Sequence, residues 1–231
     1  MWEKDYYEVH DKMYIGTDCI IFGFDNGVLK LLIFKRRIEP NVGEYSLIGS
    51  FVKLEESISN AASRVLHEIT GLQNVFMEEL KTYNAVERDP GFRCVSVGQY
   101  ALIRIDDYDK DLVEKHGAMW YTFDELPDLV LDHNQMVEDA MARLRRKAKY
   151  QPIGLELLPE KFTLPQLQSL YEAIYQRKMD SRNFRKKVLS FGVLIKLEEK
   201  DKTSSRKGAF YYKFDYEKYK ELLAQGIYFV V

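Results

Sequence analysis

Two apolar runs stand near the start of the chain, at 14–24 and 28–35, and only Asp25-Asn26-Gly27 separates them. Asn-Gly between two such runs is typical of a two-residue hairpin turn, because that turn needs positive φ at both positions. The pattern therefore predicts that the chain opens with an antiparallel β-hairpin.

A helix and further strands follow this hairpin. After loop chemistry at Pro40 and Gly43, apolar residues recur at helical spacing, and Gly71 is a suitable stop: Ile58, Ala61, Ala62, Val65, Leu66 and Ile69. Residues 81–105 predict two strands around an Asp-Pro-Gly loop, and 134–149 a second helix. Strands on both sides of a helix predict a compact α/β/α sandwich over 1–150.

The pattern changes after residue 150. The stretch 150–162 has two prolines and no periodicity, which predicts a linker. A helix opened by Thr163 follows, then a second helix with Asp180 or Ser181 as N-cap and Gly192 as stop. Two strand-like runs around a polar, basic tip come next. Helix, turn, helix and hairpin is the order of a winged helix-turn-helix, predicted here as a second domain over 151–231.

Charge separates the two predicted domains. Residues 151–231 hold 15 Lys and Arg against 10 Asp and Glu, a net charge of +5, whereas 1–150 hold 19 against 26, a net charge of −7. The whole chain carries only −2. Only the second domain is therefore suited to a polyanion.

Composition excludes several classes of protein. The chain is 46% hydrophobic and 30% charged, as in ordinary globular proteins. Its two cysteines, Cys19 and Cys94, lie in apolar runs, which favours buried thiols over a disulfide framework or a CxxC metal site. No apolar run approaches the ~20 residues of a membrane span, and the first residues lack a signal pattern. We expect a cytoplasmic protein without membrane partners.

The segment from Gly49 to Leu72, GSFVKLEESISNAASRVLHEITGL, resembles the Nudix box of the Nudix hydrolases. Five positions match the motif in register: Glu56, Arg64, Glu68, Gly71 and Leu72. In that family, two further glutamates hold the divalent cations that act on a pyrophosphate. Val65 and Ile69 stand at those two positions here.

Aliphatic side chains supply no oxygen ligands for a hard cation such as Mg²⁺. The resemblance therefore implies a Nudix-like domain with no catalytic residues, no metal and no cofactor. The surviving Arg64 and Glu68 are four apart on a helix, which makes a simple ion pair the favoured interpretation. An active Nudix pyrophosphohydrolase is the alternative.

The resemblance also places a small-molecule site in the former substrate cleft. Arginines beside carboxylates bind either sugar hydroxyls or an anionic phosphate; a surface ion-pair loop is the alternative. The candidate effector-binding residues are Glu44, Ser46, Glu56, Arg64, Glu68, Arg88, Asp89 and Arg93.

The second helix of the C-terminal domain carries the residue types that read a major groove: Arg or Lys for guanine, Asn for adenine, and the rest for phosphates. From Arg177 to Lys207 there are 11 basic and 4 acidic residues. A solvated basic face is the alternative to DNA binding. The candidate DNA-binding residues are Ser181, Arg182, Asn183, Arg185, Lys186, Lys187, Lys202, Arg206 and Lys207.

A degraded Nudix box joined to a winged helix resembles the Nudix-related transcriptional regulators of the NrtR type. RDPGFRCVSVGQYAL and FTLPQLQSLYEAIYQRKMDSRNFRKKVLSFG look close to the AraR branch, which answers to L-arabinose and controls its utilisation genes. The resemblance implies a homodimeric repressor that leaves palindromic double-stranded operator DNA when L-arabinose binds. ADP-ribose is the alternative effector, and a protein-binding C-terminal module is the alternative function.

Overall fold

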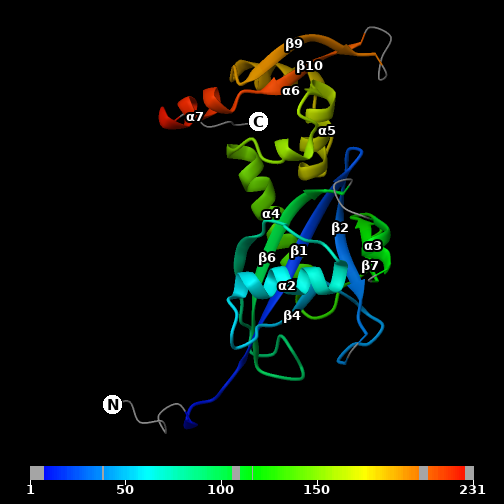
Figure 1. Cartoon of the computed structure of the whole chain (residues 1–231), viewed down its shortest axis with the longest axis vertical. Helices are drawn as coiled ribbons and strands as arrows, with labels where there is room; N and C mark the ends of the chain where they lie inside the picture. The colour runs from blue at the N-terminus through cyan, green and yellow to red at the C-terminus, as the bar shows by residue number, and fades with distance from the viewer. Residues whose placement is uncertain (1–7, 38, 106–109, 116, 203–207, 227–231) are drawn as a thin grey trace.

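The computed structural model describes residues 8–37, 39–105, 110–115, 117–202 and 208–226 and stacks two bodies along the long axis of the molecule (Figure 1). The chain enters through the hairpin of β1 (Tyr14–Asp25) and β2 (Val28–Lys35). Asn26 and Gly27 form its turn with φ of 48° and 85°, and Asp25 pairs with Val28. The predicted Asn-Gly hairpin is confirmed.

The first body is built on a mixed seven-stranded sheet. Its main path is β3-β2-β1-β6-β5, while β4 pairs with β1 and β7 with β2. β1 is parallel to β6, and the remaining pairs are antiparallel. The strands besides β1 and β2 are β3 (Tyr45–Ser46), β4 (Ile48–Phe51), β5 (Glu78–Tyr83), β6 (Cys94–Arg104) and β7 (Ala118–Thr122).

Helices cover both faces of this sheet: α2 (Ile58–Thr70) on one face and α4 (His133–Tyr150) on the other, with α3 (Lys110–Lys115) beside β7. Alternate residues of β1 face opposite sides. Cys19 and Ile21 belong to the core under α2, and Ile20 and Phe22 to the core under α4. Burial on both faces explains the continuous apolar run of β1. The α/β/α sandwich is confirmed.

Local chemistry sets the ends of α2. Ser57 is its N-cap, and the hydroxyl oxygen accepts the Asn60 N–H at 3.1 Å. Gly71 adopts φ of 77° just past the end and donates its N–H to the His67 carbonyl. The predicted stop at Gly71 is confirmed, because this left-handed conformation costs glycine little.

The second body has the order predicted for a winged helix. Thr163 opens α5 with a reciprocal capping box to Gln166. Its three-stranded sheet has the order β8-β10-β9. The elements are β8 (Phe162–Thr163), α5 (Leu164–Tyr175), α6 (Ser181–Ser190), β9 (Leu194–Asp201), β10 (Ala209–Phe214) and α7 (Tyr216–Ala224).

The stretch predicted as a linker is packed rather than free. It holds the 3₁₀ turn η2 (Leu155–Leu157), and its leucines belong to a continuous core that runs from the first sheet through α4 to α5. Gly154 has φ of 73°, and a Cβ there would lie 3.2 Å from a methyl group of Leu170. The apolar residues of this short segment follow neither helical nor strand spacing, so the sequence did not predict that they are buried. Among the described helices, none combines the length and the apolarity that crossing a membrane requires.

Candidate functional site

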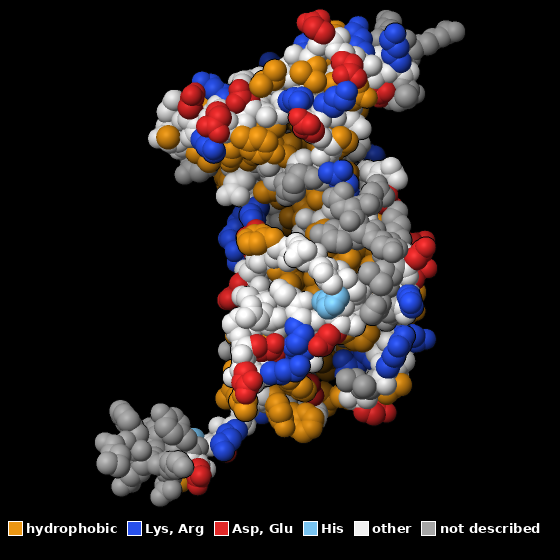
Figure 2. All heavy atoms as spheres, in the orientation of Figure 1, with side chains coloured by type: hydrophobic (Ala, Val, Ile, Leu, Met, Phe, Trp, Pro, Cys, Tyr) orange, Lys and Arg blue, Asp and Glu red, His pale blue; other side chains and the backbone are white. Residues whose placement is uncertain are grey.

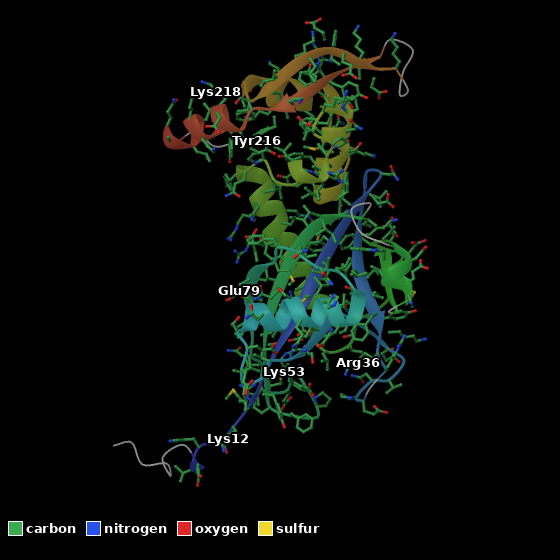
Figure 3. The ribbon with its side chains drawn as sticks, viewed as in Figure 1. Lys12, Arg36, Lys53, Glu79, Tyr216 and Lys218 are labelled. Atoms are coloured by element: carbon green, nitrogen blue, oxygen red, sulfur yellow. The ribbon has the colours of Figure 1, made fainter. Side chains whose placement is uncertain are left out.

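A cavity of about 130 Å³ opens between the starts of β1 and β6, the end of β3 and the start of α4. Polar side chains from all four elements line it: Asp18, Ser96, Ser46 and His133. Arg36, Arg88 and Asp89 join them from loops. Figure 3 labels Arg36, just beyond β2, and Lys53, just beyond β4, at the lower end of this body.

Asp18 lies at the centre of the polar lining. Its Oδ2 accepts the Ser96 hydroxyl at 2.6 Å and lies 3.5 Å from Nη2 of Arg88, while its Oδ1 lies 3.5 Å from Nε2 of His133. Gly49 comes so close that a Cβ there would overlap the Asp18 carboxylate at 2.0 Å. A glycine at 49 is therefore what allows a buried carboxylate at this point of the sheet.

Arg88 is buried between two carboxylates. Its Nε and Nη2 donate to the two carboxylate oxygens of Asp132 at 3.0 and 2.7 Å, a bidentate pair that fixes the plane of the guanidinium. Burial acts to lower the pKa of Arg88, but the hydrogen bonds to Asp132 and the charge of Asp18 outweigh it and raise that pKa. Arg88 thus remains a cation at the wall of the cavity.

His133 is the first residue of α4, and its imidazole is buried in the cavity wall. Its Nδ1 accepts the Leu47 N–H at 3.2 Å, so the neutral ring carries its proton on Nε2, which faces Asp18. Burial lowers the pKa of His133 below its ordinary value, against the opposing charge of Asp18. The neutral imidazole therefore presents its Nε2–H as a donor next to the Asp18 carboxylate, which is an acceptor.

The surviving residues of the Nudix box form a separate cluster. Arg64 donates to both Glu56 oxygens, at 2.9 and 2.5 Å, and to Glu68 at 3.0 Å. The hydrogen bond from Arg64 and that from the Lys53 N–H lower the pKa of Glu56 to about 2. These three side chains pair with one another and do not line the cavity.

The two aliphatic replacements lie on the core side of α2. Val65 is fully buried against the sheet, and Ile69 packs partly buried against the same cluster. Among the described residues, no group of three or more His, Cys, Asp or Glu side chains is placed to hold a metal ion. Position 65 therefore contributes packing, because its side chain continues the apolar core under α2.

The cavity contains only part of the set predicted from the sequence. Ser46, Arg88 and Asp89 line it, but Glu44 and Arg93 do not. The Arg93 guanidinium instead donates to the carbonyls of Asn84, Ala85 and Cys94. Effector binding by the residues predicted from the sequence stays a prediction.

Several polar residues of the site were not among the predicted ones, including Asp18, Arg36, Ser96 and His133 in the lining and Asp132, the partner of Arg88. A signal existed for Asp18, the only charged residue within the apolar run 14–24. His133 lies one residue before the predicted start of the second helix and is the first residue of α4, but nothing local in the sequence indicated its contact with β1.

Exposed aromatic rings stand at the mouth of the cavity. The Tyr14 ring lies 5.0 Å from that of Phe51, which lines the cavity, and 5.3 Å from that of Phe92. Figure 2 shows hydrophobic side chains gathered at this lower end of the molecule. Such rings offer flat surfaces on which a planar ligand group can stack.

The second candidate site is the outward face of α6. Asp180 is its N-cap, and its carboxylate accepts the Asn183 N–H at 2.8 Å. Phe184 and Val188 are buried, and the Phe184 ring lies 5.8 Å from that of Tyr171 on α5. The polar residues of α6 predicted to bind DNA are all exposed: Ser181, Arg182, Asn183, Arg185, Lys186 and Lys187.

A groove of about 640 Å³ follows α6 along the turn from α5. Basic residues edge it on both sides: Arg177, Lys178, Lys186 and Lys187. Lys202, predicted for the wing, is exposed at the end of β9, whereas Arg206 and Lys207 lie outside the described residues. The arrangement presents cations and an amide along one exposed helix, as contact with a nucleic-acid groove requires.

Both bodies of the chain are similar to known proteins. A family model described as the NrtR DNA-binding winged helix domain matches residues 154–214. The chain is 30% identical over 207 residues to "ADPR responsive transcriptional repressor NtrR" of Acinetobacter baylyi, covering 88% of this chain and 82% of the relative. It is 28% identical over 130 residues to "ADP-ribose pyrophosphatase" of Methanocaldococcus jannaschii, covering 56% of this chain and 76% of the relative.

Solved structures agree with these relatives. Shewanella oneidensis NrtR complexed with a 27mer DNA is similar with a TM-score of 0.73 and 27% identity, over 89% of this chain and 95% of that one. The Nudix domain of the same protein complexed with ADP ribose is similar with a TM-score of 0.50 and 25% identity, over 62% and 99%. The two-body architecture is thus shared across nearly the whole chain.

Proposed function

The chain belongs to the NrtR family of Nudix-related transcriptional regulators, and from that premise we propose that it represses transcription by binding operator DNA through α6 and releasing it when ADP-ribose binds. One observation carries the proposal: a polar cavity shares a chain with a Nudix-box helix that has aliphatic side chains at 65 and 69, and with an exposed basic helix. Such a cavity can bind a ligand without cleaving it.

ADP-ribose takes precedence over the L-arabinose expected from the sequence, because the relatives reported above carry ADP-ribose in their names. The ligand has two charged phosphates, a base and two sugars. Arg36 and Arg88 offer cations to the phosphates, and the rings of Phe51 and Tyr14 offer a stacking surface for the base. One sugar then enters the cavity towards Asp18 and His133.

L-arabinose stays a second candidate because of the cavity's size. The space is about 130 Å³, below the ~300–1,000 Å³ of most small-molecule sites. A single pentose ring suits such a volume, and a nucleotide sugar must extend beyond the mouth. Asp18, Ser96 and His133 would hold its hydroxyls as paired donors and acceptors.

The effector is identified by thermal unfolding of the full chain with ADP-ribose, AMP, L-arabinose and D-ribose. A ligand at 100 times its Kd stabilises the folded state by about 2.7 kcal/mol. For a chain of this size, that raises Tm by about 5–10 °C. We expect this rise with ADP-ribose, together with loss of binding to a duplex selected from random sequence.

If L-arabinose raises Tm and the other three ligands do not, L-arabinose is the effector. AMP controls for adenine stacking without the second sugar, and D-ribose controls for the presence of a pentose alone. No rise with any of the four ligands would contradict the assignment of the cavity as an effector site.

The proposal also predicts that ADP-ribose is bound and not hydrolysed. With Mg²⁺ present, we expect AMP to form no faster than without protein, because Val65 and Ile69 offer no oxygen ligands to the cation. Chromatography of the nucleotide after incubation measures this. AMP formation that Glu68→Gln abolishes would instead establish an active pyrophosphohydrolase, the activity named for the Methanocaldococcus relative.

The working form that we propose is a homodimer on a palindromic operator. In that arrangement, the α6 helices of the two protomers enter major grooves one helical turn, about 34–36 Å, apart. An effector releases the duplex only if its affinities for two arrangements of the α6 helices differ. Binding at the cavity must therefore change the position of α6, which lies in the other body.

A further inference from the structure

Helix α4 connects the cavity with the winged helix. It has 18 residues, which corresponds to a length of about 27 Å at 1.5 Å per residue. Its first residue, His133, lies in the cavity wall, and its C-terminal half packs with α5 in the continuous core. Figure 1 shows α4 rising from the first sheet to the underside of the second body.

The start of α4 is held by groups that face the cavity. Asp132 is the N-cap residue, but its side chain caps no N–H of the helix, because both carboxylate oxygens accept from Arg88. His133 faces Asp18 in the same way. A ligand that takes Arg88 or Asp18 as its partner therefore competes directly with the first turn of α4.

Farther along α4, Arg145 reaches α5. Its Nε donates at 3.3 Å to the carbonyl of Ile174 in the last turn of α5, where carbonyls have no partner within the helix. The turn from α5 to α6 is short and held by hydrogen bonds: the Met179 N–H donates to Glu172, and Asp180 then caps α6. A movement of the α5 end thus reaches α6 within a few residues.

Strands β1 and β2 also run between the cavity and α5: Asp18 lies near the start of β1, Arg36 follows the end of β2, and Gly27 in their turn lies beside Ser169. However, β2 is paired with β1, β3 and β7, and β1 is hydrogen-bonded in the middle of the sheet, in parallel register with β6 from Tyr14 to Phe24. Sliding either strand would break these ladders. Helix α4 contacts the sheet through side chains, and packed helices slide by small shear movements.

We infer that α4 transmits effector binding to α6, with Arg145 as the positioning residue at its contact with α5. This inference deepens the proposed function and rests on it. Ligand contact with Arg88 and Asp18 frees the first turn of α4, the helix shifts over the sheet, and Arg145 carries the shift to the carbonyl of Ile174. Arg145 touches neither the cavity lining nor the outward face of α6.

The test replaces Arg145 with alanine in the full chain and compares two readouts. The first is the rise in Tm caused by saturating ADP-ribose, which reports binding at the cavity. The second is the ratio of operator Kd with and without ADP-ribose, which reports coupling and spans about 5- to 150-fold in allosteric proteins. We expect a wild-type Tm rise and a ratio that falls at least about fivefold.

Arg146→Ala is the matched control, because Arg146 is the next residue of α4, is exposed and has the same charge. Arg146→Ala should show the wild-type rise in Tm and the wild-type ratio of operator Kd values. Arg145→Lys, which retains a donor, should show part of the wild-type coupling. An Arg145→Ala protein with wild-type coupling would overturn the inference, as would one that loses basal operator affinity while its coupling ratio stays unchanged. If ADP-ribose leaves the Tm of the wild-type protein unchanged, the effector assignment is overturned instead.

Discussion

Replacing Arg182 and Lys186 together with alanine lowers operator affinity about 30-fold or more. The two residues are four apart on α6, and Lys186 lies midway between the buried Phe184 and Val188. At 100° per residue, this position points directly away from the core, and Arg182 shares its face. A side chain that reads a base contributes about 1–3 kcal/mol, so the pair contributes about 2–6 kcal/mol.

The salt dependence distinguishes DNA binding from general loss of structure. The slope of log Kd against log salt should fall by about one unit for each phosphate contact removed and stay unchanged for contacts made only to bases. Arg143 and Lys147 on α4 are already engaged with β5, so Arg146→Ala serves as the control that removes an exposed cation outside α6, and it should bind like wild type. Unchanged operator affinity in the double variant would show that α6 is not the recognition helix.

Replacing Arg88 with methionine destabilises the protein by about 3–5 kcal/mol, because it leaves Asp132 and Asp18 facing each other without their shared cation. At about 2–4 °C per kcal/mol, Tm falls by about 6–20 °C. The same variant loses its response to the effector. Thermal unfolding and urea titration measure the first effect, and the ligand-induced shift in Tm measures the second.

Arg93→Met is the control for Arg88→Met, since Arg93 lies on the same loop and donates only to backbone carbonyls. We expect it to cost about 1 kcal/mol and to keep the effector response. Adding Asp132→Asn to Arg88→Met removes one unpaired charge and should recover part of the lost stability. A stable Arg88→Met protein with an intact effector response would contradict the role given to this side chain.

Much of the fold was predictable from the sequence, because its signals are local. Asn26-Gly27 specifies its turn through backbone conformation, Gly71 ends α2 for the same reason, and the spacing of Phe184 and Val188 identifies the inward face of α6. Each signal lies within a few residues of its effect. Elements without such signals, such as β7, β8, α3 and α7, were not predicted.

The site was predictable only in part. Ser46, Arg88 and Asp89, which the resemblance to the Nudix-type family named as effector-binding residues, line the cavity, whereas nothing in the sequence indicated the pairing of Arg88 with Asp18 and Asp132. The box also named Glu56, Arg64 and Glu68, which form ion pairs with one another outside the cavity lining, so that their part in effector binding stays a prediction. A motif places a segment in a fold without saying which of its polar groups already have partners.

By itself, the sequence determined the two-domain order, the basic second helix of the winged domain and the absence of carboxylates at 65 and 69. Those properties reside in residue type and short-range spacing. Only the tertiary structure decided that Asp18, Ser96 and His133 meet in one cavity and that α4 reaches from it to α5. Such contacts join residues far apart in the chain, and their formation depends on how the sheet and its covering helices pack.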